Sequence, residues 1–305
     1  MAASEHSATP GKRIRLKDGR YLGYEGYGDP RGKPVFYFHA MPGSRLQRHP
    51  GLSTRKTRST IFRAVAPPSI RLITIDRPGY GLSSFQPGRQ LLDWPDDVVQ
   101  LADALAIGRF AILGVSGGGP HAAACAYKIP ERLAAVAMVS SLRPLHGPHG
   151  AESMSRLAHL GLRLGRDAPL LLWPLVWLLS NPGRDPAKFV RQGYESLPAS
   201  DQAILDQPDF TAMLIEDSAE SARHGVRAYW WDLVLLARPW GFRLSDITMP
   251  IHLWHGEEDS IIPVHMGHYL ASALPNCQAH FLPGEGHFLF MEHLAEILAV
   301  LASLG

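Results

Sequence analysis

One serine of this chain lies where nucleophilic chemistry is expected. Ser116 is the centre of Gly114-Val115-Ser116-Gly117-Gly118, a G-x-S-x-G pattern. The apolar run 110–113 before it predicts a buried strand, and the alanine-rich stretch 120–126 after it predicts a helix. A sharp turn between strand and helix lifts a serine hydroxyl above the edge of a sheet. The pattern alone also fits an ordinary glycine-rich turn, so a nucleophilic serine requires partners elsewhere in the chain.

A nucleophilic serine needs a base that accepts its proton and a third group that orients the base. His287 lies in Gly284-Glu285-Gly286-His287-Phe288, directly after the last predicted strand. Ligands bind at the carboxyl ends of strands in open α/β sheets, so a histidine in this loop can face the cleft. A solvated loop histidine is the alternative. We predict that His287, among 15 histidines, is the base.

The orienting acid is expected at the end of another strand, between the serine and the histidine in sequence. The loop after the predicted strand 251–254 contains Glu257, Glu258 and Asp259. Asp259 lies just before the chain becomes apolar again, so we predict that it is the acid and that the two glutamates are solvated. The stretch 139–143, after the preceding strand, offers no carboxylate.

The negative charge that forms on the attacked carbonyl oxygen needs N–H donors that are already in place. One is the backbone N–H of Gly117, at the start of the predicted helix, where the helix dipole also favours an anion. The other belongs to the loop 39–44, which follows the predicted strand 35–38. We predict the N–H of Met41 as this donor, because Pro42 has none.

The elements that would position these loops alternate between strand and helix patterns. Short apolar runs predict buried strands at 35–38, 72–75, 110–113, 133–139, 251–254 and 279–282. Helical spacing predicts helices at 93–107, 120–126, 264–273 and 289–304, and a hairpin around Asp18-Gly19 precedes them. This alternation predicts an α/β fold with a mostly parallel, twisted sheet and helices on both faces.

The alternation stops between about residues 141 and 245, where the chain is helix-like, rich in tryptophan and interrupted by prolines. We predict a helical lid insertion over residues 143–245, inside a core domain formed by residues 1–142 and 246–305. An apolar or aromatic substrate pocket over Ser116 is expected from residues of the lid and of the loop after the first parallel strand: His39, Trp173, Trp177, Trp230 and Trp231. The alternative is that the tryptophans form the core of the lid itself.

The composition excludes several partners. With 30 basic and 28 acidic residues and a net charge of +2, the chain gives no electrostatic case for nucleic acid or an anionic membrane. The apolar run 168–179 is too short to span a bilayer, and residues 1–13 lack the apolar region of a signal peptide. We expect a solvated face for a basic cluster after the loop 39–44: Arg45, Arg48, Arg55, Lys56, Arg58 and Arg63.

The two cysteines, Cys125 and Cys277, form neither a disulfide framework nor a metal-binding spacing, and they fit a reducing compartment. We therefore expect a cytoplasmic protein that uses no cofactor and no metal. The sequence does not determine its oligomeric state.

Taken in order, these segments resemble the α/β-hydrolase superfamily over nearly the whole chain. His39-Ala40-Met41-Pro42-Gly43 is similar to the family's H-G-x-P-G oxyanion loop, with Ala40 where glycine is usual. The segment 76–83 is similar to its D-x-x-G-x-G-x-S motif, which implies a structural role for Asp76. The segments 114–118, 256–259 and 286–287 match its nucleophile, acid and base loops.

Within this superfamily a serine nucleophile implies acyl transfer to water. We expect a serine hydrolase that cleaves an apolar, small-molecule carboxylic ester, as a carboxylesterase, lipase or lactonase does, through an acyl-enzyme on Ser116. The same three residues also serve C–C bond hydrolysis, perhydrolysis or lyase chemistry, and a slow-turnover ligand receptor can retain them. The sequence leaves these alternatives open.

Overall fold

The structure is a computed structural model that describes residues 11–52, 70–146 and 156–304. Its centre is an eight-stranded sheet in the order β1-β2-β4-β3-β5-β6-β7-β8. The strands β1 and β2 form an antiparallel hairpin, β2 also pairs antiparallel with β4, and every other pairing is parallel. Their bounds are β1 Lys12–Arg15, β2 Tyr21–Gly28, β3 Lys33–Phe38, β4 Ile70–Ile75, β5 Phe110–Val115, β6 Leu133–Val139, β7 Ile251–Gly256 and β8 Cys277–Leu282.

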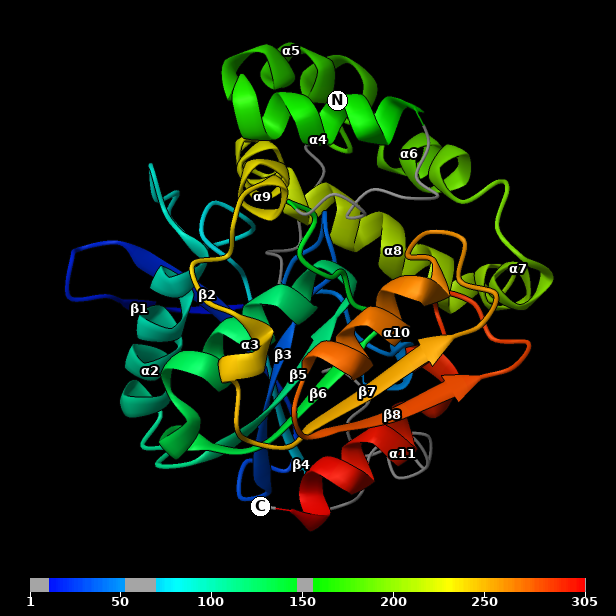
Figure 1. Cartoon of the computed structure of the whole chain (residues 1–305). Helices are drawn as coiled ribbons and strands as arrows, with labels where there is room; N and C mark the ends of the chain where they lie inside the picture. Colours follow the sequence, from blue (N-terminus) through cyan, green and yellow to red (C-terminus); the bar gives the residue numbers. More distant parts are fainter. Residues whose placement is uncertain (1–10, 53–69, 147–155, 305) are drawn as a thin grey trace, which may run out of the picture.

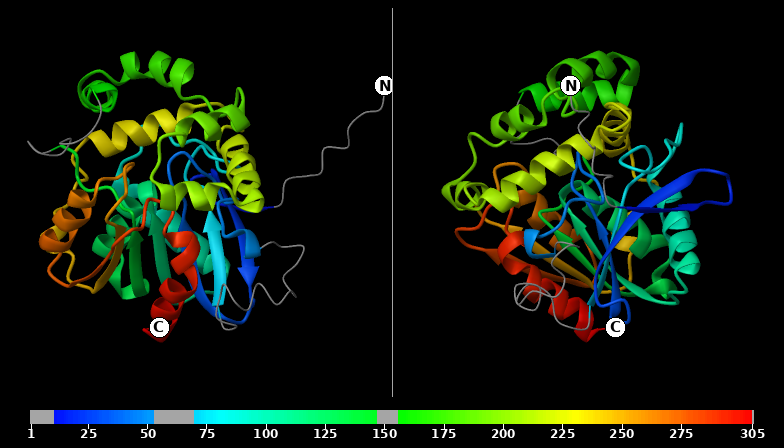
Figure 2. Two further views of the ribbon diagram at one scale, coloured as in Figure 1. Left: turned by 90° about the vertical axis from the view of Figure 1, so that its right-hand side faces the viewer. Right: turned by 180° about the vertical axis from the view of Figure 1, so that it is seen from behind.

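The apolar runs of the sequence form the central strands because both faces of the sheet are covered. All side chains of β5 and β7 are buried, as continuous apolar runs in a parallel sheet require. On one face the strands pack against α2 (Trp94–Ala104), α3 (Gly119–Lys128) and α10 (Val264–Ala273). On the other face they pack against α11 (Phe290–Ser303) (Figures 1 and 2). The predicted α/β fold class is confirmed.

In the described part of the chain, six α-helices lie in sequence between β6 and β7, and we call them the cap helices. They cover the end of the sheet at the top of Figure 1, away from the chain's C-terminus. Their bounds are α4 Arg156–Asp167, α5 Pro169–Leu179, α6 Pro186–Gly193, α7 Ala199–Leu205, α8 Pro208–Ser221 and α9 Arg227–Ala237. Short 3₁₀ turns complete the described part of the chain at Pro50–Leu52, Leu91–Asp93, Ser116–Gly118, Pro130–Arg132 and Leu244–Asp246.

Buried polar contacts fasten the cap helices to the core. The carboxylate of Asp232 in α9 accepts from both Arg77 and Arg89 of the core. On α8, Glu220 accepts from Arg45 at 2.6 Å. A buried ion pair is costly to form, and removing one partner leaves an uncompensated charge. These buried ion pairs therefore favour one particular docking of α8 and α9 on the core.

The expectation that Arg45 belongs to a solvated basic face is wrong. Its side chain is fully buried and also donates to Asp76 at 2.9 Å, so it belongs to the interior and not to a solvated basic face. Arg48 is half-buried, and the other members of the cluster, residues 55–63, lie outside the described residues. Asp76 has the structural role expected for it, because it also accepts from the backbone N–H groups of Arg45 and Leu82.

In the described ranges no helix combines the length and apolar character needed to cross a membrane.

Candidate active site

Ser116 occupies the sharp turn between β5 and α3. Its φ of 53° lies in the left-handed region, which is uncommon for a residue with a side chain. The turn is tightly enclosed: a Cβ on Gly114 would lie 2.7 Å from the carbonyl oxygen of Gly118, and one on Gly118 would overlap the Phe38 carbonyl. The glycines of the pattern are therefore required by close packing, and the backbone strain is concentrated at the serine.

His287 and Asp259 meet in the loops after β8 and β7. The Nδ1 atom of His287 lies 2.8 Å from Oδ2 of Asp259, and both residues are buried. The other oxygen, Oδ1, accepts from the backbone N–H groups of Ile261 and Ile262 at 2.9 and 2.8 Å. Burial alone would lower the pKa of His287, but the Asp259 carboxylate outweighs it and holds this pKa above its ordinary value.

The other ionisable groups of the loop after β7 are placed differently. Glu257 and Glu258 are exposed, as expected. His255 is buried with its Nε2 atom 3.7 Å from Asp259, but that nitrogen lies 2.7 Å from the Ile262 carbonyl oxygen. Burial lowers the pKa of His255, which keeps its ring neutral. Asp259 is thus the carboxylate that the loop presents to His287.

Ser116 and His287 share the wall of a pocket of about 200 Å³. In the part of the chain that the structure describes, the serine hydroxyl and the imidazole form no direct hydrogen bond. Catalytic hydrogen bonds are often long in structures without substrate and tighten when it binds. The arrangement brings a hydroxyl, an imidazole and a buried carboxylate to the same edge of the sheet.

The loop after β3 places Met41 against the start of α3. A Cβ on Gly117 would lie 3.4 Å from the Met41 nitrogen, so the two backbones are in close contact. Side chains behind the loop hold it: Oε1 of Gln47 accepts from the Ala40 N–H at 2.6 Å, and Arg77 donates to the carbonyl of Ala40 at 3.0 Å. The braced loop therefore holds the backbone of Met41 against Gly117, the residue that follows Ser116 at the start of α3.

His39 does not line either pocket beside Ser116, contrary to the expectation that it contacts substrate. Its ring is fully buried, with Nε2 accepting from the Arg77 N–H at 3.2 Å. Burial holds the pKa of His39 well below its ordinary value, and the charge of Arg77 adds to this effect. His39 is a neutral, internal support of the loop.

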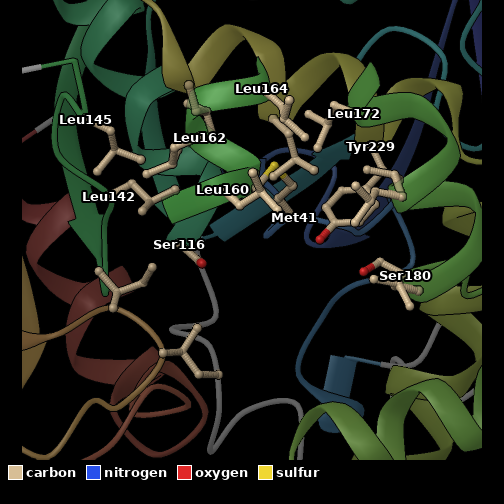
Figure 3. Close-up of a pocket in the computed structure, with 18 residues that line it drawn as sticks. Met41, Ser116, Leu142, Leu145, Leu160, Leu162, Leu164, Leu172, Ser180 and Tyr229 are labelled. Carbon is tan, nitrogen blue, oxygen red and sulfur yellow. The ribbon is translucent and has the colours of Figure 1, made fainter. Parts of the chain in front are cut away.

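A larger cavity of about 360 Å³ opens on the cap side of Ser116 (Figure 3). Its walls are aliphatic and come mainly from α4, α5 and α9, with Leu142 and Leu145 from the segment after β6. Leu160 and Leu179 line it and are also exposed, so the cavity reaches the surface between α4 and α5. Tyr229, which has a hydrogen bond with Ser180, lies across the cavity from Ser116 and lines both pockets.

The predicted tryptophan pocket is wrong: none of the four tryptophans lines the cavity or the pocket beside it. Trp173 and Trp230 pack edge to face in a cluster of the cap helices, with ring centroids 5.4 Å apart. Trp231 donates to the Arg89 carbonyl at 3.0 Å and joins α9 to the core. Trp177 is 47% exposed beneath the guanidinium of Arg184. The alternative role, packing of the cap itself, applies to most of them.

One residue close to the base was missed by sequence reasoning. Asp201 of α7 is fully buried and accepts from the backbone N–H groups of His287 and Phe288 at 2.9 and 2.8 Å. It lies 86 residues from His287 in a helical stretch interrupted by prolines, and no local pattern distinguishes it from the exposed acids nearby.

Over the described ranges, no group of three or more histidine, cysteine, aspartate or glutamate side chains could hold a metal ion.

Comparison with known proteins places the chain among proteins of the same architecture. A family model described as the alpha/beta hydrolase fold matches residues 33–168. A protein of Variovorax paradoxus named as a carbamate hydrolase, RutD, is 27% identical over 87% of this chain and 89% of its own. The pimeloyl-[acyl-carrier protein] methyl ester esterase of Nitrosomonas europaea is 26% identical over 72% of this chain and 79% of its own.

Solved structures agree on the fold. The esterase RhEst1 from a Rhodococcus species superimposes with a TM-score of 0.68, and the match covers 97% of this chain and 99% of that one. The two sequences are only 20% identical, so this likeness concerns the architecture.

Proposed function

We propose that this chain, a hydrolytic enzyme of the α/β-hydrolase superfamily, cleaves carboxylic esters through an acyl-enzyme on Ser116. The observation that carries the proposal is the pairing of His287 with Asp259 at 2.8 Å, beside the pocket that contains the strained serine. Among the relatives, one is named as a methyl ester esterase and another as a carbamate hydrolase, and both names describe hydrolysis at an acyl carbon bonded to a heteroatom.

In the proposed reaction, Oγ of Ser116 attacks the ester carbonyl carbon while Nε2 of His287 accepts the hydroxyl proton. The tetrahedral intermediate collapses as the bond to the alcohol oxygen breaks and that oxygen takes the proton from His287. Water then attacks the acyl-enzyme, giving its proton to His287, and the acid leaves as Ser116 is protonated again. Asp259 keeps the proton of the neutral imidazole on Nδ1, so that Nε2 is free to act as the base.

The negative oxygen of each intermediate is proposed to lie between the N–H groups of Met41 and Gly117. Donors that are fixed before reaction stabilise this charge at no cost of reorganisation, and one such donor typically contributes about 10²–10³-fold in kcat. The hydrogen bonds from Gln47 and Arg77 that brace the loop support this assignment.

The two pockets suggest how the substrate is oriented. His287 lines the smaller pocket and not the larger cavity. Because the leaving oxygen takes its proton from His287, we place the alcohol in the pocket of about 200 Å³ and the acyl chain in the cavity of about 360 Å³. The aliphatic walls fit an acyl chain, whereas the small polar group of a carbamate would leave them uncovered.

The test combines active-site labelling with a panel of p-nitrophenyl esters of increasing acyl length. We expect a fluorophosphonate to label the wild type and not Ser116→Ala, and we expect hydrolysis to be most efficient for a chain of several carbons. Wild-type protein that resists labelling would contradict the serine mechanism. Labelling without turnover of any ester would favour one of the alternative chemistries or a receptor.

A further inference from the structure

The backbone of the proposed base is held on several sides. The core contributes the Asp259 carboxylate on the ring and the Ser140 hydroxyl, which donates to the His287 carbonyl at 3.1 Å. The cap contributes Asp201, whose two oxygens accept separately from the N–H groups of His287 and Phe288. Both residues lie in the loop just before α11, whose N-cap is Leu289.

The contact with Asp201 is built for close approach. A Cβ on Gly286 would overlap the Asp201 carboxyl group, so only glycine allows the loop to lie this close to α7. Beside it, the ring of Phe288 packs edge to face against Tyr194 and Phe210, with centroids 5.1 and 5.2 Å away. The loop that presents the base is therefore packed against α7 and its neighbours in the cap as well as against the core.

We propose that Asp201 is a positioning residue through which the cap fixes the place of the His287 imidazole. The inference rests on the proposed function, since it concerns the same base. Asp201 lines neither pocket, so it acts on the reaction only through His287. Cap and base form one unit, and the base reaches its working position only when α7 is docked on the loop.

Among the described residues, the charged and titratable groups that act on His287 come from the loop after β7 with the end of that strand, and from α7. Asp259 and His255 belong to the strand β7 and its loop, and Asp201 belongs to α7. Burial lowers the pKa of His287, whereas the charges of Asp259 and then Asp201 raise it. Loss of the Asp201 charge therefore shifts the acid limb of the pH profile to lower pH, an effect that loss of packing alone does not produce.

The first variant is Asp201→Asn. Its amide keeps one acceptor oxygen, but its NH₂ group faces the second backbone N–H, so one buried donor loses its partner. Because a shift of about 1 Å in a catalytic group can cost 10²-fold, we expect kcat to fall about 10- to 100-fold. KM should stay within about threefold, since no substrate contact changes. Asp206→Asn, an exposed aspartate at the end of the same helix, is the matched control and should behave as wild type.

A second pair of variants separates charge from placement. Asp201→Glu retains the charge, so its acid limb should stay at the wild-type pH even where kcat is reduced. Gly286→Ala pushes the loop away from Asp201, which keeps its charge, so it should reduce kcat with a smaller shift of the limb than Asp201→Asn. Gly286→Ala also tests the contact if Asp201→Asn fails to fold.

His287 is followed by NMR titration of its ring protons, assigned with His287→Gln, as well as by the ester assay. A lower pKa of His287 in Asp201→Asn, with the wild-type value in Asp206→Asn, supports the proposal even if no fluorophosphonate labels Ser116. In that case it is the proposed function that fails. Wild-type kcat and an unchanged His287 titration in Asp201→Asn would overturn the role of Asp201 while leaving the serine mechanism intact. A loss of kcat that matches the loss in melting temperature, with no change in titration, would also overturn it.

Discussion

Both oxygens of the Asp259 carboxylate have hydrogen-bond partners, and the two oxygens contact different groups. The backbone N–H groups of Ile261 and Ile262 fix one oxygen, and the ring of His287 meets the other. An acid held in this way can select the tautomer of the histidine, because only the imidazole with its proton on Nδ1 donates to a carboxylate.

Replacing Asp259 with Asn tests this selection. The amide oxygen can still accept from Ile261 and Ile262, but the NH₂ group then faces Nδ1 and favours the wrong tautomer. We expect kcat for the best ester to fall by about 10⁴-fold, the size of effect known for this change in another serine enzyme, with little change in KM. The measurement is steady-state hydrolysis of that ester. Glu258→Gln, one residue earlier and exposed, should retain wild-type activity. If Glu258→Gln is the inactive variant, the assignment of the acid is wrong.

Residues such as Ser116, Asp259 and His287 can be predicted from sequence because each lies in a short loop directly after a strand with a clear apolar pattern. Their order along the chain then adds a second constraint. Asp201 and Asp232 lack both signals. Each lies in a helix, and its partners are 86 and 155 residues away in sequence, so burial is created only when the cap docks.

At the scale of elements, the strand and helix positions follow from apolar spacing, and the helix predicted at 264–273 has those bounds in α10. The lining of the cavity does not follow. Tryptophan and leucine side chains of the cap can both fill an apolar pocket, and which of them faces Ser116 depends on how α4, α5 and α9 rotate when they pack. The leucines line the cavity, while Trp173 and Trp230 fill the space between helices.

Gly161 of α4 offers a direct test of the acyl cavity. It lines the cavity, and a Cβ added there meets no heavy atom within 4 Å. Gly161→Leu should therefore fill part of the cavity without disturbing the helix. Compared with alanine it adds about three carbons, and at about 0.8 kcal/mol per displaced CH₂ the longest esters should lose roughly 2 kcal/mol, or about 30-fold in kcat/KM.

Gly161→Ala is the matched control, since both variants remove a helix glycine and gain up to about 1 kcal/mol of helix stability. Acetyl ester hydrolysis should be unchanged in both variants, and only the leucine variant should shift the preferred acyl length downward. A panel of p-nitrophenyl esters measures the shift. An unchanged preference in Gly161→Leu would place the acyl chain elsewhere.

At the scale of the whole molecule, the cap and the core are joined by carboxylates that are buried on docking: Asp201, Asp217, Glu220 and Asp232. The pKa values of two of them are shifted in opposite directions. Burial raises the pKa of Asp232, but Arg77 and Arg89 outweigh it and lower that pKa to about 2. Asp217 has Ser44 as its main partner, which donates through its N–H and its hydroxyl at 2.7 Å each. The burial of Asp217 outweighs these hydrogen bonds and raises the pKa of its carboxyl group to about 7.

Asp217 should therefore make the stability of the whole molecule depend on pH. The folded carboxyl group keeps its proton up to about pH 7, whereas the unfolded one loses it near 3.8, so the folded state binds more protons between these values. Its contribution to the free energy of unfolding falls as pH rises through this window, by an amount on the order of 4 kcal/mol at roughly 1.4 kcal/mol per unit. Asp232 acts with the opposite sign but below pH 4, where its stabilising effect is lost as pH falls toward 2.

Asp217→Asn keeps the oxygen that Ser44 uses and cannot ionise, so its free energy of unfolding should change less than that of the wild type between pH 5 and 8. Urea unfolding at several pH values measures both slopes. Asp209→Asn, exposed on the same helix, is the control and should retain the wild-type slope. Equal slopes for Asp217→Asn and wild type would mean that Asp217 is already ionised in the folded protein. The contact between α8 and the core would then join a charged carboxylate to Ser44.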